Sequence, residues 1–187
     1  GSTEVGKKII AASIGNLKRV TLELGGKSPM VVFPDADLEK VIPGVTRGAF
    51  FLNGQNCMAG TRLFVHGDIF DTVVERVAQM AGQFRIGHGL SPDSDLGPLI
   101  SAEQRERVMG YVNAGKKSGA ELVCGGDVLP GRGFFMKPTL FSRTTMDMSI
   151  AREEIFGPVL CVQAFNDSDL QAVANEANRS IYGLSGS

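Results

Sequence analysis

The sequence predicts an α/β fold in which a largely parallel sheet lies between two layers of helices, a three-layer αβα arrangement. Short apolar runs with β-strand character alternate with segments of helical period along the whole chain. This alternation is typical of parallel strands that are connected by helices. Glycine supplies 24 of the 187 residues, well above its usual share of about 7%. That many glycines indicate tight connections, or backbone that passes close to a ligand.

Composition and charge exclude several functional classes. The chain is 43% hydrophobic and 21% charged, with a net charge of -1 and a pI near 6.2. These values give no electrostatic reason to expect a nucleic acid or an anionic membrane as a partner. No apolar run approaches the roughly 18 residues that a membrane span needs. Three widely spaced cysteines, Cys57, Cys124 and Cys161, match neither a disulfide framework nor a metal site, so we expect a reducing, cytoplasmic location and no metal.

The first elements are a helix and two β-like runs. Residues 1–16 are predicted to form a helix that Ser2 or Thr3 caps. In the β-like run that follows, Leu22 and Leu24 share one face and Glu23 lies on the other. Glu23 is therefore expected at a strand end, where α/β folds often carry catalytic groups. A solvated strand face is the plainer interpretation of the same pattern.

The later elements follow from periodicity, caps and turn residues. A helix over 101–119 is expected to begin with a capping box formed by Ser101 and Gln104. Pro138 falls inside a strand predicted over 134–141, which favours an edge position. The other predicted elements are helices over 37–52 and 68–84, a strand over 62–66, a long loop over 85–99, a strand over 121–126, a helical turn followed by a strand within 149–165, and a last helix over 167–180.

Cys57 lies in a polar segment between an apolar helix and an apolar strand. Gly54 and Gly60 stand on either side of it, and amide side chains surround it. This setting favours a thiol presented in a tight loop, where backbone N–H groups point at a ligand. From spacing alone, an ordinary loop cysteine is an equally good interpretation.

Five motifs together resemble the NAD(P)-dependent aldehyde dehydrogenases. They are GSTEVG at 1–6, LELGGKSP at 22–29, GQNC at 54–57, EEIFGPV at 153–159 and YGLS at 182–185. They occur in the family's order, and the resemblance runs essentially from end to end. It implies an oxidoreductase that acts on a small-molecule aldehyde with NAD, or alternatively NADP, as its cofactor. It also implies a homodimer or homotetramer for the intact protein.

The resemblance assigns roles residue by residue. Cys57 matches the family's nucleophile and Glu23 its general base. Glu154 matches the carboxylate that holds the nicotinamide-side ribose, and the Ile-Phe-Gly-Pro register selects it over Glu153. Phe156 matches the aromatic residue near the nicotinamide. The complete set of cofactor-binding residues that the resemblance implies is Gly1, Ser2, Gly6, Leu24, Gly25, Glu154 and Phe156.

The implied chemistry explains why these residue types are needed. The Cys57 thiolate adds to the aldehyde carbon, hydride leaves, and water activated by Glu23 hydrolyses the resulting thioester. An unperturbed thiol has a pKa near 8.5, so the site must favour the thiolate. A base that works near neutral pH requires an apolar pocket around Glu23.

The resemblance also predicts a division of the chain. Residues 1–24 are expected to be the C-terminal remnant of a dinucleotide-binding domain, and 25–187 a catalytic domain that stops short of its C-terminal end. We therefore expect residues 1–187 alone to lack dehydrogenase activity. Two alternatives are a cysteine hydrolase that uses Cys57 and Glu23 without hydride transfer, and a catalytically silent binding or assembly module. A hydrolase has no use for a ribose-binding motif such as EEIFGPV, which disfavours it.

Overall fold

The computed structural model describes residues 1–166 and 170–187, and it contains one five-stranded sheet. The strands are β1 (Pro29–Val32), β2 (Arg62–His66), β3 (Glu121–Cys124), β4 (Thr139–Ser142) and β5 (Val159–Phe165), in the order β1-β2-β5-β4-β3. All neighbouring pairs are parallel except β3 and β4. The predicted α/β class with a largely parallel sheet is therefore confirmed.

The helices lie close to their predicted positions. They are α1 (Thr3–Ser13), α2 (Leu38–Phe50), α3 (Phe70–Gly82), α4 (Ala102–Lys117), α5 (Ser149–Arg152) and α6 (Leu170–Ala177). Asp37 caps α2, since its carboxylate accepts a hydrogen bond from the N–H of Glu39. The predicted start of the last helix at Asp167 lies outside the described residues.

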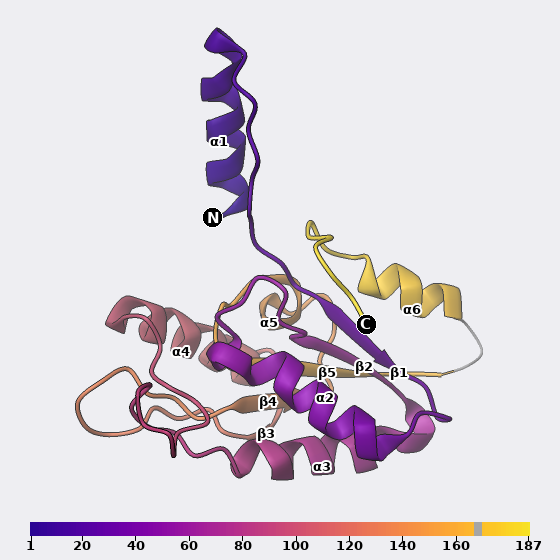
Figure 1. Ribbon diagram of the computed structural model, residues 1–187. Helices are drawn as coiled ribbons and strands as arrows, with labels where there is room; N and C mark the ends of the chain where they lie inside the picture. Colours follow the sequence, from indigo (N-terminus) through magenta and orange to yellow (C-terminus); the bar gives the residue numbers. More distant parts are fainter. Residues whose placement is uncertain (167–169) are drawn as a thin grey trace.

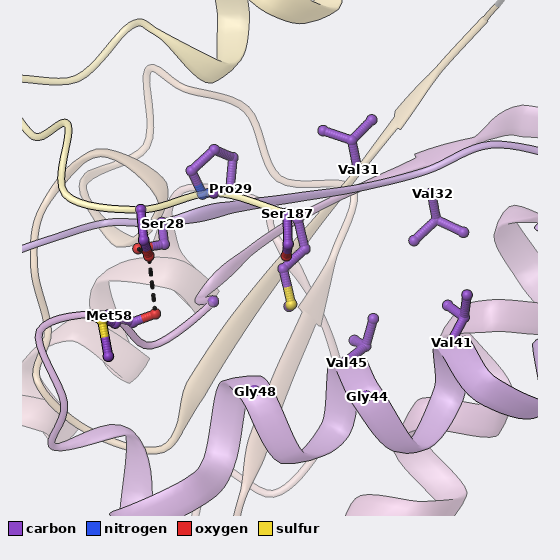
Figure 2. Close-up of a pocket in the computed structure, with 14 residues that line it drawn as sticks. Ser28, Pro29, Val31, Val32, Val41, Gly44, Val45, Gly48, Met58 and Ser187 are labelled. Atoms are coloured by element: carbon purple, nitrogen blue, oxygen red, sulfur yellow. Dashed lines mark hydrogen bonds between the residues drawn. The ribbon is translucent and has the colours of Figure 1, made fainter.

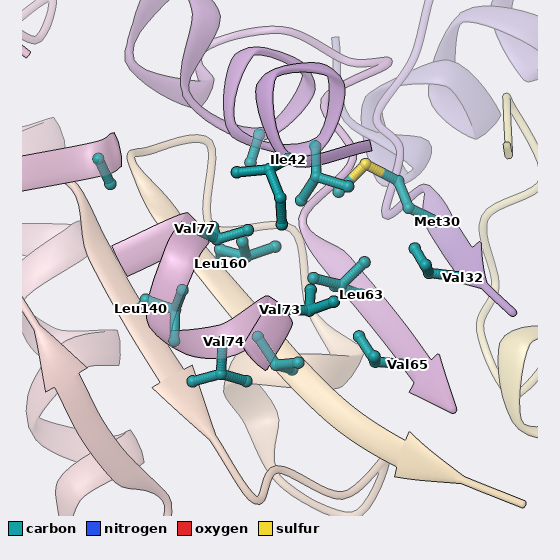
Figure 3. Packing of buried hydrophobic residues seen from close by; sticks show 14 of the residues in the cluster. Met30, Val32, Ile42, Leu63, Val65, Val73, Val74, Val77, Leu140 and Leu160 are labelled. Atoms are coloured by element: carbon teal, nitrogen blue, oxygen red, sulfur yellow. The ribbon is translucent and has the colours of Figure 1, made fainter. Parts of the chain in front are cut away.

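Residues that alternate along each strand pack on opposite faces of the sheet. Leu63 and Val65 of β2 join the cluster beneath α2 and α3, together with Val73 and Val77 (Figure 3). Phe64, between them, packs on the other face with Val173 of α6. This period of two divides the sheet into two buried faces.

Helices α4 and α5 cover that second face. Val108 and Val112 of α4 and Ile150 of α5 are fully buried against side chains of β4 and β5. Helices therefore lie on both sides of the sheet, which is the predicted three-layer arrangement.

The first of the two predicted β-like runs, which carries Leu22, Glu23 and Leu24, does not form a strand. Helix α1 projects from the body of the molecule, and the chain returns along it in extended form before it enters the sheet (Figure 1). Leu22 and Leu24 do share one face, but that face packs on Gly6 of α1. The alternation of faces is therefore as predicted. A strand also needs a neighbouring strand, and none among the described residues pairs with this segment.

The predicted edge position of the strand over 134–141 is wrong as well. β4 begins at Thr139, after Pro138, and it pairs with β3 on one side and β5 on the other. Because Pro138 precedes the strand, it removes no hydrogen bond from the ladder. The proline marks where the strand begins, and β3 takes the edge.

Three parallel strands begin at the same edge of the sheet. Pro29 of β1 lies opposite Arg62 of β2, and Arg62 lies opposite Cys161 of β5. The segments that enter these strands carry the Gly25–Gly26 turn, the Cys57 loop and residues 153–158. Ligands of parallel α/β sheets commonly bind at the carboxyl ends of the strands, whereas here the motif residues gather at the amino ends.

Candidate active site

A cavity of about 630 Å³ lies where these segments meet. Its volume falls within the range of roughly 300–1,000 Å³ that is usual for small-molecule sites. It is lined by Gly1, Ser2, Glu23, Leu24, Gly25, Gln55, Asn56, Cys57, Gln104, Arg107, Glu154 and Phe156. The fold thus brings together every residue that the sequence singled out for the site, except Gly6.

The Gly25–Gly26 turn joins the two other segments. The N–H of Gly26 donates to Oε1 of Glu154 at 2.9 Å. A Cβ atom on Gly25 would overlap the carboxylate of Glu154, and one on Gly26 would overlap the carbonyl oxygen of Cys57. Both glycines are therefore required by close approach of their neighbours, which holds the carboxylate and the Cys57 loop around one turn.

Cys57 follows a strained stretch of backbone. Leu52, Asn53 and Gly54 are left-handed in succession, with φ values of 52°, 57° and 63°. Buried Asn53 donates from its side-chain amide to the carbonyl oxygen of Gly97 at 2.9 Å, which holds this turn in place. Two consecutive non-glycine residues in this conformation are uncommon, and such strain concentrates at functional sites.

Among the cysteines of the described residues, Cys57 is the one that lines this cavity. It is half-buried, 3.8 Å from Oδ1 of Asn56, and that same oxygen accepts from the N–H of Met58 at 3.0 Å. Burial raises the pKa of the Cys124 thiol and raises the pKa of the Cys161 thiol to about 11. Both shifts disfavour the thiolate, as is typical of cysteines that serve as packing residues.

Glu23 lines the cavity but is exposed. Its carbonyl oxygen accepts a hydrogen bond of 2.7 Å from the nitrogen of Gly1, which ties it to the start of α1. The apolar surroundings expected for a base that works near neutral pH are not supplied by the described residues. Leu22 and Leu24, on either side of Glu23, pack on Gly6 of α1 instead.

Glu154, and not its neighbour, faces the cavity. Glu153 points elsewhere and accepts a hydrogen bond of 2.9 Å from the hydroxyl of Tyr111, with Arg152 also in contact. Of the two carboxylates, Glu154 therefore lines the cavity, and its contact with a ribose stays a prediction.

At the start of α1, Ser2 acts as the cap, because its hydroxyl accepts from the N–H of Val5 at 3.3 Å. Gly1, Ser2 and Leu24 line the cavity. Gly6 does not: it is buried, and its missing side chain makes room for Leu22 and Leu24. In the structure Gly6 is a packing residue, and its predicted contact with a cofactor stays a prediction.

Four lining residues were not identified from the sequence, namely Gln55, Asn56, Gln104 and Arg107. The first two stand directly before Cys57, and that position was the available signal. Gln104 and Arg107 come from α4, far away in sequence. Gln104 was assigned to a capping box, and no motif marks Arg107.

Lys27 is buried beneath the glycine turn. Its side chain is 2% exposed, and its Nζ has no hydrogen-bond partner among the described residues. Burial lowers the pKa of this ammonium to about 8. The backbone carbonyl oxygen of Lys27 accepts a hydrogen bond from Nε of buried Arg62 at 2.7 Å, so two cationic residues lie together in the interior.

A second cavity, of about 420 Å³, lies between β1 and α2 (Figure 2). Its lining includes Ser28, Met58 and Ser187, together with valines and glycines, and it contains no cysteine, acidic or basic side chain. Of these two cavities, the one around Cys57 contains the thiol and the carboxylates.

The described ranges 1–166 and 170–187 meet the requirements of neither a metal site nor a membrane-spanning helix. No group of three or more His, Cys, Asp or Glu residues there is arranged to hold a metal ion. No helix there has both the length and the apolar character needed to cross a membrane.

Comparison with known proteins gives a consistent result over the whole chain. The model of the aldehyde dehydrogenase family matches residues 1–187. DhaS of Bacillus subtilis, which is named as a putative aldehyde dehydrogenase, is 49% identical over 184 residues, or 98% of this chain and 37% of its own length. A betaine aldehyde dehydrogenase of Brucella ovis is 48% identical over 188 residues, covering 98% of this chain and 38% of the relative.

Solved structures agree with these relatives. An NAD+ complex of an aldehyde dehydrogenase from Bacillus cereus matches with a TM-score of 0.95 and 46% identity, over 100% of this chain and 38% of that one. This chain therefore spans little more than a third of the length of the proteins that it matches. With the family's model matched from the first residue to the last, the chain belongs to the aldehyde dehydrogenase family.

Proposed function

We propose that this chain forms the catalytic portion of an enzyme that oxidises an aldehyde to a carboxylic acid with NAD+, or alternatively NADP+. The observation that carries the proposal is the meeting of Cys57, Glu23, Glu154 and Phe156 in one cavity, although they come from three separate segments. Family membership supports the reaction class. The NAD+ complex of the Bacillus cereus enzyme supports the choice of cofactor.

The cavity suits a nicotinamide riboside. The Glu154 carboxylate is anchored at one oxygen by the Gly26 N–H, which leaves the other oxygen to accept from ribose hydroxyls. The Phe156 ring is 37% exposed and lines the same cavity, as an aromatic wall for a planar ring. When bound, the cofactor supplies a two-electron acceptor for hydride.

In the proposed mechanism the Cys57 thiol loses its proton to solvent and its sulfur bonds to the aldehyde carbon, which turns the carbonyl oxygen into the oxyanion of a thiohemiacetal. Loss of hydride from that carbon produces a thioester on Cys57. Glu23 then takes a proton from water as the water attacks the thioester carbon. The carbon–sulfur bond breaks, the acid is released and Cys57 returns as the thiolate.

Two alternatives remain. A cysteine hydrolase would use the Cys57 thiol but would not need Glu154 and Phe156 to bind a cofactor. A catalytically silent module would use neither the thiol nor these two residues. The test is an assay of the full-length gene product with NAD+ and a panel of aldehydes that includes betaine aldehyde. We expect wild type to form reduced cofactor and acid in equal amounts. Cys57→Ser should lower the turnover rate at least about 1,000-fold, since the thiol nucleophile is removed.

Cys124→Ala is the matched control, because this half-buried thiol lies outside the cavity; it should retain turnover. Acid without reduced cofactor would favour the hydrolase, and a folded wild type without turnover would favour the silent module. Equal dehydrogenase activity in Cys57→Ser would disprove the assignment of the nucleophile.

We also propose the division of the chain at residues 24 and 25, a homodimer or homotetramer for the intact protein, and a cytoplasmic location. The projection of α1 and its return segment from the sheet supports the division (Figure 1). The three free cysteines support a reducing compartment. Family membership is the ground for the oligomer.

A further inference from the structure

The side chain of Gln104 does not complete the capping box that its position predicts. The backbone N–H of Gln104 donates to Oγ of Ser101 at 3.2 Å, so half of the capping box is present. Its amide group instead reaches the segment before β5. There Nε2 donates to the carbonyl oxygens of Ile155 at 3.0 Å and Phe156 at 2.8 Å. Both hydrogens of the amide are used on these two carbonyls.

Phe156 is a residue that needs such support. Its φ is +57°, in the left-handed region, where a bulky side chain is a true outlier. Ile155 before it is anchored in the core, with 1% of its surface exposed, whereas Phe156 is 37% exposed and lines the cavity. A left-handed conformation at a bulky residue persists only where surrounding contacts fix it.

A second residue of α4 extends the same contact. Arg107 lies one turn after Gln104, on the same helix face. Its guanidinium donates to the carbonyl oxygen of Glu154 at 2.9 Å and lies 5.4 Å from the centre of the Tyr111 ring. Two side chains of α4 therefore bind three successive carbonyls, those of Glu154, Ile155 and Phe156.

We infer that Gln104 is a positioning residue, which holds the backbone of Phe156 in the left-handed conformation and so directs its ring into the cavity. The inference rests on the proposed function, in which that ring packs on the nicotinamide. Gln104 acts through Phe156 and affects the cofactor more than the aldehyde. A direct contact between Gln104 and the cofactor is the competing explanation, because Gln104 also lines the cavity.

A double-mutant cycle in the full-length gene product separates the two explanations. Gln104→Met keeps the length of the side chain and removes both donors. We expect it to raise KM for NAD+ about tenfold, equivalent to about 1.4 kcal/mol, with KM for the aldehyde changed less than twofold. In a Phe156→Ala background the same substitution should change KM for NAD+ less than twofold, because the residue that it positions is gone.

Glu106→Met is the matched control, since Glu106 is exposed on the same helix and lies outside the cavity. It should leave both KM values unchanged. Equal effects of Gln104→Met in the wild-type and Phe156→Ala backgrounds would overturn the inference in favour of direct contact. A Gln104→Met protein that behaves like Glu106→Met would contradict both explanations, because the side chain of Gln104 would then have no effect on cofactor binding. If Gln104→Met impairs folding, Gln104→Asn, which keeps the amide but shortens its reach, takes its place in the cycle.

A second readout needs no turnover. With 4-fluorophenylalanine at position 156, the fluorine NMR resonance of the cofactor-free protein should shift or broaden in Gln104→Met and stay unchanged in Glu106→Met. A responsive resonance in a protein without dehydrogenase activity would leave the positioning role intact and disprove the proposed function. An active enzyme whose resonance does not respond to Gln104→Met would disprove the positioning role alone.

Discussion

The N–H of Gly26 donates a hydrogen bond of 2.9 Å to Oε1 of Glu154, which lies 128 residues further along the chain. This bond fixes the carboxylate against the turn that enters β1. On the other side of the same turn, Gly26 packs on the carbonyl oxygen of Cys57. The carboxylate and the nucleophile loop therefore share one support, and substitutions at this support should affect the cofactor and the thiol together.

Gly25→Ala tests this shared support. The new methyl group would overlap the Glu154 carboxylate, which must then move or rotate away from the Gly26 N–H. We expect KM for NAD+ to rise at least tenfold, or about 1.4 kcal/mol, in steady-state assays of the full-length gene product. Gly110→Ala in α4 is the control, because nothing lies within 4 Å of the added carbon. It should stabilise the protein by about 0.5–1 kcal/mol without loss of activity. A normal KM for NAD+ in Gly25→Ala would contradict the close approach.

Glu154→Gln and Glu153→Gln form a matched pair of adjacent substitutions. The amide oxygen that Glu154→Gln introduces can still accept from the Gly26 N–H, but the negative charge is lost. Because hydrogen bonds to charged groups are worth about 1.5–3 kcal/mol and neutral ones about 0.5–1.5 kcal/mol, we expect NAD+ to bind roughly tenfold more weakly in Glu154→Gln. Glu153→Gln should bind normally, since Glu153 faces Tyr111. Isothermal titration with NAD+ measures both, and equal losses would show that the two carboxylates are not distinguished.

Buried Lys27 makes stability depend on pH. Its pKa is about 8 in the folded protein against 10.5 in its ordinary state. Between these values the folded protein has released a proton that the unfolded chain still holds, so stability should rise with pH from about 8 to 10.5. The full change is about 3 kcal/mol. Below pH 8 the cost of the buried charge is fully present.

Lys27→Met should therefore stabilise the protein at pH 7 and remove this rise. Thermal unfolding midpoints of wild type and Lys27→Met across pH 7 to 10.5 give the comparison. Cys161→Ala is needed alongside, because the raised pKa of its thiol, about 11, has the opposite sign: stability is lost as pH rises from 9 toward 11. Parallel curves for wild type and Lys27→Met would show that the lysine stays charged throughout.

The left-handed turn before Cys57 predicts a pair of opposite effects. Leu52 is exposed and left-handed, so Leu52→Gly should relieve strain and stabilise the protein by about 0.5–1 kcal/mol. Asn53→Ala loses the hydrogen bond to Gly97 and should destabilise it by about 1–3 kcal/mol. Urea unfolding measures both. Destabilisation by Leu52→Gly would mean that the side chain of Leu52 contributes packing that outweighs its strain.

The sequence predicts individual elements well where local chemistry decides them. The strand over 62–66 has the same bounds in the structure, and Ser101 caps α4 as predicted. Apolar period and a capping hydroxyl are both local signals. Eight of the twelve residues that line the cavity were also identified, because they occur in the motifs that carry the resemblance.

Pairing between distant segments was not predictable in the same way. Residues 20–24 have the alternation of a strand, yet a strand forms only where another strand lies beside it. The sequence around Pro138 does not reveal that β4 begins one residue later, at Thr139. The position of Gln104 in the sequence fits a capping box as well as it fits a side chain that bonds the backbone of Phe156. Only the position of the segment before β5 distinguishes these two roles.

The gathering of motif residues at the amino ends of β1, β2 and β5 also determines where the chain can change length. Segments that enter these strands must keep their length, since one residue more before Pro29 or Arg62 would move a reacting group relative to the sheet. The segment that leaves β1, residues 33–37, lies at the opposite edge. A reporter peptide inserted there would leave the cavity undisturbed, which makes this edge the place to label or tether the protein without touching its chemistry.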